Sequence, residues 1–167
     1  PLGNKLRDIL LDNKTGAISP RAEALMYAAD RAHHVYSTIR PALQRGEVVI
    51  SDRYFDSSIA YQGAGRVLLP TEVARISRWA TESLAPILTV IMDLPAETGL
   101  GRLQSTDRLE SEPLAFHERV RQEYLNLAYQ DPERFLIVDA SLNIEQIHQV
   151  IIERVSTIKL LKRNQKQ

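Results

Sequence analysis

Three short apolar runs, each followed by or ending in aspartate, constrain the fold of this chain more than any other feature. They cover residues 47–50, 86–93 and 135–139, and their aspartates are Asp52, Asp93 and Asp139. Such near-continuous apolar runs are typical of strands buried on both faces of a parallel sheet. Segments with helical spacing separate them, which predicts an α/β fold, a three-layer parallel sheet with helices on both faces.

The carboxyl ends of parallel strands meet at one edge of a sheet, where ligands bind. Asp52 has the arginine Arg53 beside it, so it is the better candidate for function. Asp93 and Asp139 are instead expected to cap the helices that follow them.

The helices are predicted from apolar spacing and from their start signals. Ser19 suits an N-cap and Pro20 a first helical position, so a long helix should run from there to about Leu43. Its apolar stripe includes Leu25 and Tyr36. The other predicted helices cover about 1–11, 70–82, 112–130 and 143–161, with one more beginning at residue 95, and Trp79 and Leu114 are expected in the core.

Composition excludes several classes of protein. The 167 residues are predicted to form a single domain, 1–167. Lysine and arginine number 21, as do aspartate and glutamate, so no overall positive field attracts nucleic acid. No apolar run is long enough to cross a membrane. The absence of cysteine excludes disulfides and thiol catalysis, and we expect a cytoplasmic protein.

The segment from Ser51 to Arg66 carries the densest group of polar side chains. It begins with Asp52 and Arg53 and continues as a polar loop with hydroxyls, an amide and two glycines. A guanidinium at a strand end suits bidentate binding of phosphate. The hydroxyls and the amide suit the edges of a base and a sugar, which indicates a nucleotide pocket. The alternative is a structural ion pair followed by ordinary turn residues.

Glu23, Tyr27 and Arg31 recur every four residues on one flank of the long predicted helix. A tyrosine with an arginine one turn later could stack a base and hold its phosphate. Spacing alone favours the other interpretation, an ordinary surface stripe of ion-pair and cation–π contacts.

The segment Asp52-Arg53-Tyr54 with the later Ala60-Tyr61-Gln62 and Gly63-x-Gly65-Arg66 resembles the signature of bacterial thymidylate kinases, and residues 27–32 resemble that family's helix. The resemblance implies a P-loop nucleoside monophosphate kinase-like fold and phosphorylation of dTMP by ATP. It makes Tyr27 a base-stacking residue and Arg31 and Arg53 phosphate ligands. The other implied substrate-binding residues are Asp52, Ser57, Ser58, Tyr61 and Gln62, with Tyr61 against a ribose 2′-hydroxyl.

Residues 101–112 resemble the family's lid, a segment that closes over the ATP phosphates. The resemblance implies catalytic roles for Arg53, Arg102 and Arg108, of which Arg102 would also bind ATP. It places adenine against Asp139, Ala140 and Ser141. The cofactor implied is Mg²⁺, carried with ATP, and the residues single out no protein ligand for it. The lid is a few residues shorter than the family leads us to expect, near Ser105 and Thr106.

No glycine is followed by lysine, so the phosphate-binding pattern G-x-x-x-x-G-K-[ST] is absent. The resemblance implies that a strand, this loop, a helix and a second strand precede Pro1. If the loop is truly absent, the alternative is a non-catalytic nucleotide-binding domain. A deoxynucleoside kinase is the enzyme alternative, but those usually carry Glu-Arg-Ser in place of Asp52-Arg53-Tyr54. The family also implies a homodimer. From the balanced charge and the short apolar runs we expect no nucleic-acid or membrane partner.

Overall fold

The computed structural model describes residues 2–103 and 107–164. The predicted shortening of the lid near Ser105 and Thr106 falls outside these residues. The helices and strands are, in chain order, α1 (Leu2–Leu11), the 3₁₀ turn η1 (Asn13–Thr15), α2 (Pro20–His34), the π-helical η2 (Val35–Ile39), α3 (Arg40–Gln44), α4 (Phe55–Ser58), the π-helical η3 (Ile59–Gly65), α5 (Pro70–Ala80), β1 (Thr89–Asp93), α6 (Ala96–Leu100), α7 (Leu114–Gln130), β2 (Phe135–Asp139) and α8 (Ile144–Asn164).

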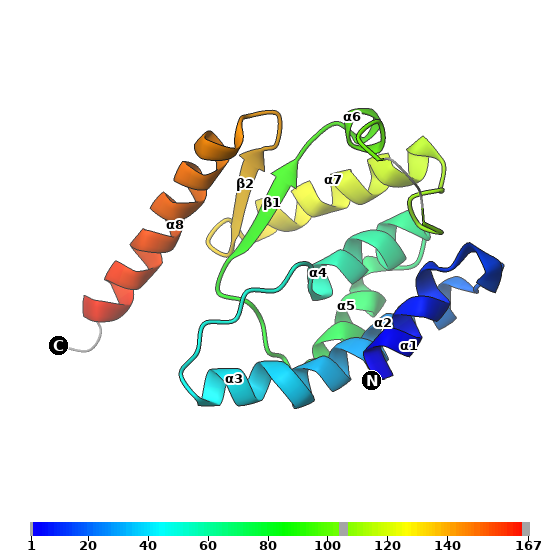
Figure 1. The fold of residues 1–167 in the computed structure, drawn as a ribbon, viewed down its shortest axis with the longest axis horizontal. Helices are drawn as coiled ribbons and strands as arrows, with labels where there is room; N and C mark the ends of the chain where they lie inside the picture. Colours follow the sequence, from blue (N-terminus) through cyan, green and yellow to red (C-terminus); the bar gives the residue numbers. More distant parts are fainter. Residues whose placement is uncertain (1, 104–106, 165–167) are drawn as a thin grey trace.

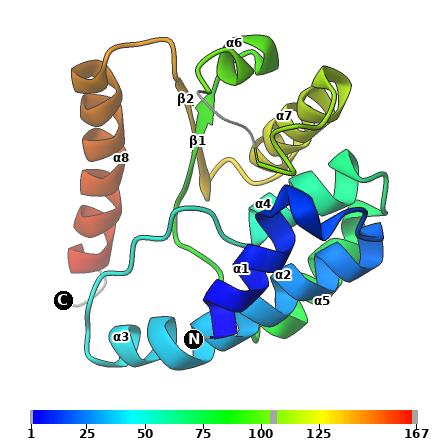
Figure 2. The same cartoon turned by 45° about the vertical axis from the view of Figure 1, so that its right-hand side comes forward.

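The sheet consists of β1 and β2, which pair in parallel with Thr89 opposite Phe135 and Asp93 opposite Asp139. Their positions confirm the second and third predicted strands, and both end in aspartate. The two strands lie between α7 and α8 (Figure 2). The described residues therefore form a mixed helix and strand fold with a small parallel sheet.

The first predicted strand is not a strand in this structure. Residues 47–50 are irregular, and Val48 and Ile50 are 84% and 94% exposed. A strand exists only where its N–H and C=O groups find a neighbouring strand. No described segment pairs with residues 47–50, so this apolar run crosses open surface between α3 and α4 (Figure 1).

The long second helix begins as predicted and continues through three segments, α2, η2 and α3. The hydroxyl of Ser19 accepts a hydrogen bond from the backbone N–H of Ala22, and Pro20 occupies the first helical turn. The π-helical turn precedes Pro41, and the N–H of Arg40 reaches back to the carbonyl of Val35. Proline lacks an N–H and clashes with the preceding turn, so a wider turn relieves it.

Among the described residues, buried apolar side chains form three small core clusters. One of them combines Ala60, Leu109, Phe116 and Val120, with Tyr27 and Tyr61 packed against it. The prediction of Trp79 as a core residue was wrong, since it is 82% exposed. Helix α5 instead buries a face of small side chains, Val73, Ala74, Ser77 and Ala80.

Several other side chains expected to be buried are exposed. Leu25 and Tyr36, both from the predicted apolar stripe, are 55% and 76% exposed, and Leu114 is 40% exposed. A helix buries only the face that meets a neighbour. For α2 and η2 that face carries Ala24, Ala28, Val35 and Ile39.

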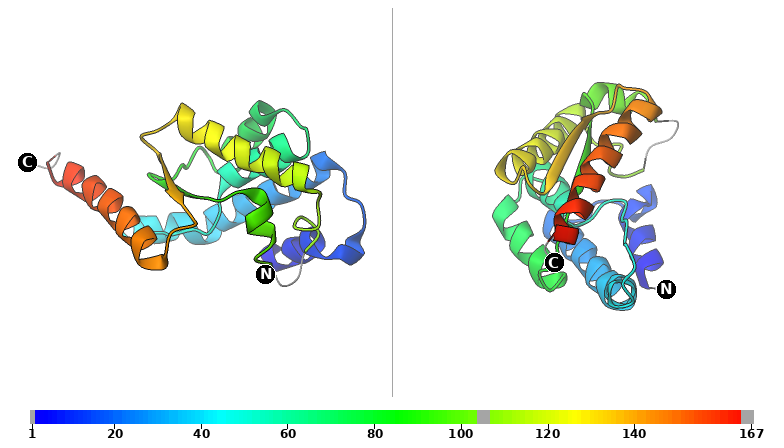
Figure 3. Two further views of the ribbon diagram at one scale, coloured as in Figure 1. Left: turned by 90° about the horizontal axis from the view of Figure 1, so that it is seen from above. Right: turned by 90° about the vertical axis from the view of Figure 1, so that its left-hand side faces the viewer.

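Figure 3 shows α8 extending away from the other helices at the C-terminal end of the chain. Among the described residues, no helix has both the length and the apolar character needed to cross a membrane.

Candidate active site

The signature segment is helical, not the loop that its composition predicted. Residues 55–65 form α4 and η3, and the chain enters them through Arg53. Arg53 has a φ of +67°, a left-handed conformation that costs a non-glycine residue about 1–2 kcal/mol. The hydroxyl of Ser51 donates to the Arg53 carbonyl at 2.8 Å and helps to hold the turn. Strain of this kind is concentrated at functional sites.

The turn at Arg53 brings its side chain over a tyrosine. The guanidinium carbon of Arg53 lies 5.0 Å from the centre of the Tyr61 ring, a cation–π contact. Arg53 itself is exposed, as is its neighbour Asp52. The Arg53 cation is therefore positioned on an aromatic ring and accessible to a ligand.

Arg31 is the buried cation of the site. Its side chain is 9% exposed, and its Nη2 donates to the hydroxyl of Ser58 at 2.8 Å. Its Nη1 is buried and has no hydrogen-bond partner among the described residues. Burial lowers the pKa of Arg31, although a guanidinium stays protonated in proteins. A buried N–H without an acceptor is costly, so this nitrogen is well suited to an anionic ligand.

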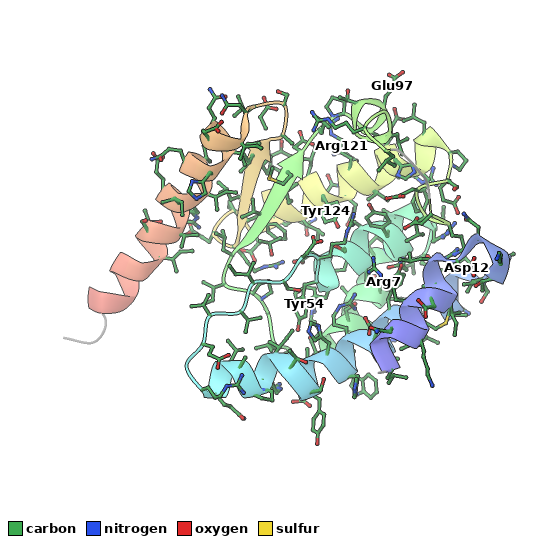
Figure 4. All side chains as sticks on the ribbon, viewed as in Figure 1. Arg7, Asp12, Tyr54, Glu97, Arg121 and Tyr124 are labelled. Carbon is green, nitrogen blue, oxygen red and sulfur yellow. The ribbon has the colours of Figure 1, made fainter. Side chains whose placement is uncertain are left out.

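Three tyrosines form the apolar wall of the site. The Tyr61 and Tyr124 rings meet edge to face with centroids 6.4 Å apart, and Tyr27 packs against the same cluster. The hydroxyl of Tyr124 donates to Ser57 at 2.6 Å. Figure 4 shows Tyr124 between α7 and α4. Burial and the nearby Glu23 carboxylate raise the pKa of Tyr27 to about 12, so its phenol stays neutral at physiological pH.

Gln62 lies deeper than the other predicted substrate residues. It is 2% exposed, and its amide nitrogen donates to the carboxylate of Glu23 at 3.0 Å. Arg108, a predicted catalytic residue, meets the same carboxylate through Nη2, and its Nε donates to the carbonyl of Leu10 at 2.7 Å. Its guanidinium is thus engaged within the protein.

Arg102 lies beside the segment that the resemblance assigns to adenine. Its Nη1 donates to the carbonyl of Ala140 in a long hydrogen bond of 3.5 Å. The Asp139 carboxylate accepts from the backbone N–H of Ser141 at 2.8 Å, and the hydrogen bonds from Ser141 lower the pKa of Asp139. The structure therefore brings together Arg102 and the 139–141 turn.

The expectation that Asp93 and Asp139 cap helices was wrong. Asn143 caps α8, since its side chain accepts from the N–H of Gln146. Asp93 pairs with Arg121 of α7 through two hydrogen bonds of 2.7 and 2.9 Å. Those hydrogen bonds lower the pKa of Asp93. The Asp139 carboxylate therefore stabilises a turn, and the Asp93 carboxylate forms an ion pair with α7.

No group of three His, Asp or Glu side chains that could hold a metal ion occurs in residues 2–103 and 107–164. A hollow of about 410 Å³ lies on another part of the surface, between Arg66, Phe116 and Arg119. None of the predicted substrate residues lines it.

Two side chains of this site were absent from the predicted set. Glu23 appeared only as the first member of the four-residue spacing with Tyr27 and Arg31. Tyr124 lies within the helix predicted at 112–130, and no pattern indicated a polar role for it. The four-residue spacing was a signal that could have pointed to Glu23. No sequence pattern indicates the hydrogen bond between Tyr124 and Ser57, because the two residues are 67 positions apart.

Comparisons with known proteins show the family of the chain. A family model described as thymidylate kinase matches residues 1–151. The thymidylate kinase of Leifsonia xyli subsp. xyli is 57% identical over 150 residues, which are 87% of this chain and 70% of that protein. That of Clavibacter michiganensis subsp. michiganensis is 53% identical, over 94% of this chain and 76% of the relative. That of Enterococcus faecalis is 44% identical, over 92% and 77%. The chain belongs to the thymidylate kinase family.

Proposed function

We propose that this protein transfers the γ-phosphoryl group of ATP to dTMP, giving ADP and dTDP, and that dTMP binds between α2 and residues 53–65. A phosphate oxygen of dTMP attacks the γ-phosphorus while the bond to the bridging oxygen of ATP breaks. Such a transfer depends on positioning and charge neutralisation more than on covalent chemistry. The thymidylate kinase family is named for the phosphorylation of dTMP.

The observation that carries the proposal is the buried Nη1 of Arg31, for which the described part of the chain provides no hydrogen-bond acceptor. A dTMP phosphate placed there would accept hydrogen bonds from Arg31 and from the accessible guanidinium of Arg53. The Arg53 guanidinium is held by its cation–π contact with the Tyr61 ring. Each charge-assisted hydrogen bond is worth roughly 1.5–3 kcal/mol. Two arginines can therefore hold the acceptor phosphate firmly.

The polar side chains of α4 and η3 suit the base and sugar. Ser57 and Ser58 carry hydroxyls, Gln62 an amide, and Tyr27 an aromatic face for stacking on thymine. We assign Tyr61 to exclusion of a ribose 2′-hydroxyl.

At the donor side we assign Arg102 to the ATP phosphates and Asp139, Ala140 and Ser141 to adenine. The hydrogen bond from Arg102 to Ala140 supports a common site for these groups. Mg²⁺ would enter with ATP, since it is usually held through phosphates and water with few protein ligands. Arg108 can assist the transfer only if it leaves part of its contact with Glu23 and Leu10.

Calorimetric titration with dTMP and with thymidine tests the acceptor site. We expect Arg31→Met to weaken dTMP binding by about 10- to 100-fold, which corresponds to the loss of about one charge-assisted hydrogen bond. Thymidine affinity should change little, because it has no phosphate. Arg45→Met is the matched control, since Arg45 pairs with Glu47 at the exposed surface. Equal dTMP affinity in wild type and Arg31→Met would contradict the assignment.

Turnover is measured separately, as conversion of dTMP to dTDP with ATP and Mg²⁺. Arg53→Ala should reduce kcat/KM for dTMP by at least tenfold without lowering the unfolding temperature. A deoxynucleoside kinase would instead phosphorylate thymidine, so thymidine as acceptor distinguishes the alternatives.

We also propose a cytoplasmic homodimer. The exposed Leu25 of α2 and Tyr36 of η2 offer apolar surface for a second copy. Sedimentation of wild type and of a Leu25→Asp variant would test this: the variant should be monomeric, and an unchanged dimer would contradict the assigned face.

A further inference from the structure

Glu23 is the most fully buried acidic side chain described, at 0% exposure, and its carboxylate is saturated with donors. One oxygen, Oε1, accepts from Gln62 Nε2 at 3.0 Å and from Arg66 Nε at 3.1 Å. The other, Oε2, accepts from Arg66 Nη2 at 3.1 Å and from Arg108 Nη2. A carboxylate with four such donors is held in one orientation.

These contacts join segments that the sequence separates widely. Glu23 lies on α2, Gln62 in η3, and Arg108 near the start of the described segment 107–164. Arg108 continues to Leu10 of α1, and Arg66 continues to Glu112. The Glu23 carboxylate thus connects α2 with the signature segment, residues 51–66, and with Arg108 of the predicted lid.

The Glu23 carboxylate is ionised in this setting. Burial alone raises the pKa of Glu23, but the hydrogen bonds from Arg66, Gln62 and Arg108 together outweigh burial and leave it lowered. An ionised carboxylate can only accept hydrogen bonds. The amide of Gln62 must therefore turn its nitrogen toward Glu23, and its oxygen faces a different direction.

We propose that Glu23 is a positioning residue that sets base specificity by fixing the orientation of the Gln62 amide. The inference rests on the proposed binding of dTMP beside Gln62. With its nitrogen committed to Glu23, Gln62 presents an acceptor oxygen to the ligand. Thymine carries a donor at N3–H, whereas cytosine has an acceptor at N3. The fixed amide therefore suits thymine and opposes cytosine, and a freely rotating amide would accommodate either base.

Titration of the full-length protein with dTMP and with dCMP tests this. Glu23→Gln keeps the size of the side chain but offers both a donor and an acceptor, so the Gln62 amide can turn over. We expect the ratio of dTMP to dCMP affinity to fall about tenfold, as for a change of one hydrogen bond. Glu112→Gln is the control, because it removes a negative charge beside Arg66 and leaves the Glu23–Gln62 bond intact; its ratio should match wild type.

A double-mutant cycle shows whether the effect passes through Gln62. In a Gln62→Ala background, Glu23→Gln should leave the affinity ratio unchanged. If Glu23→Gln fails to fold, Glu23→Asp retains the charge while withdrawing it from Gln62, and the ratio should fall there too. A ratio equal to wild type in the folded variant would overturn the inference and leave Glu23 a structural residue. Wild-type protein that binds no dTMP would instead overturn the proposed function.

Discussion

Tyr124 donates its phenol hydrogen to the hydroxyl of Ser57 at 2.6 Å and so joins α7 to α4, the first helix of the signature segment. Tyr124 also meets the edge of Tyr61, the ring beneath Arg53. Because Ser57 accepts from Tyr124, its own hydrogen remains available to a ligand. Tyr124 of α7 thereby orients the hydroxyl of Ser57 in the candidate site.

Tyr124→Phe should lower the free energy of unfolding by about 1 kcal/mol, the typical net value of one hydrogen bond. The unfolding temperature should fall by about 2–4 °C for a chain of this size. Calorimetry measures both. Tyr129→Phe is the matched control on the same helix, since Tyr129 is 72% exposed, and it should change neither value. Equal unfolding temperatures for the two variants would show that the bond to Ser57 contributes nothing.

Asp56 anchors the signature helix to the sheet through Arg134. The carboxylate is 3% exposed and accepts from both terminal nitrogens of Arg134, at 2.8 and 3.0 Å, and from Thr89. Asp56→Asn should lower the free energy of unfolding by about 3 kcal/mol, because it removes the buried counter-charge of a largely buried guanidinium and leaves only the half-exposed Asp131. Urea denaturation measures the change.

Asp131 provides the control for this pair. It meets the same Arg134 at 3.1 Å, but its side chain is 50% exposed. Asp131→Asn should therefore cost less than about 1 kcal/mol. Similar costs for the two substitutions would contradict the view that burial, and not the mere presence of an ion pair, decides the stabilisation.

The pair of Asp93 and Arg121 should make stability depend on acid pH. Hydrogen bonds from Arg121 lower the pKa of Asp93 from its ordinary 3.8. The pKa of Asp93 is thus lower in the folded protein than in the unfolded chain, where it is about 3.8. The stabilisation is therefore fully present above about pH 3.8 and is lost as the pH falls through the lower pKa of the folded protein. The side chain of Arg121 is 40% exposed, so we expect no more than about 1 kcal/mol.

Arg121→Met should accordingly be less stable than wild type at pH 7, with the difference disappearing at low pH. Urea denaturation between pH 2.5 and 7 measures it. In an Asp93→Asn background the substitution should have no such pH dependence. A constant difference across the range would mean that Arg121 stabilises the fold through packing.

Trp79 is the single tryptophan of the chain and is 82% exposed, so its fluorescence reports on one site. We expect emission resembling that of indole in water and ready quenching by acrylamide. Trp79→Gln should change the free energy of unfolding by no more than about 0.5 kcal/mol. Blue-shifted emission that moves toward that of free indole on dilution would show that a second copy covers this face of α5.

The local sequence was sufficient where short-range forces decide the outcome. Ser19 and Pro20 start α2 because a side-chain acceptor and a fixed φ favour a helix end whatever lies around it. The apolar runs 86–93 and 135–139 were correctly predicted as strands. They form β1 and β2 because each has the other as a partner strand. The site residues Arg31, Arg53, Ser58 and Tyr61 were named from the resemblance to the family, and their roles in binding stay predictions.

The tertiary structure decided what depends on a distant partner. Residues 47–50 have the composition of a strand but pair with no segment among residues 2–103 and 107–164. Trp79 faces outward because α5 packs through its small side chains. The donors that saturate Glu23 come from positions 39 to 85 residues away. Spacing along a helix shows which side chains share a face. Only folding determines which distant groups that face meets, because a buried charge is stable only where the whole chain brings donors to it.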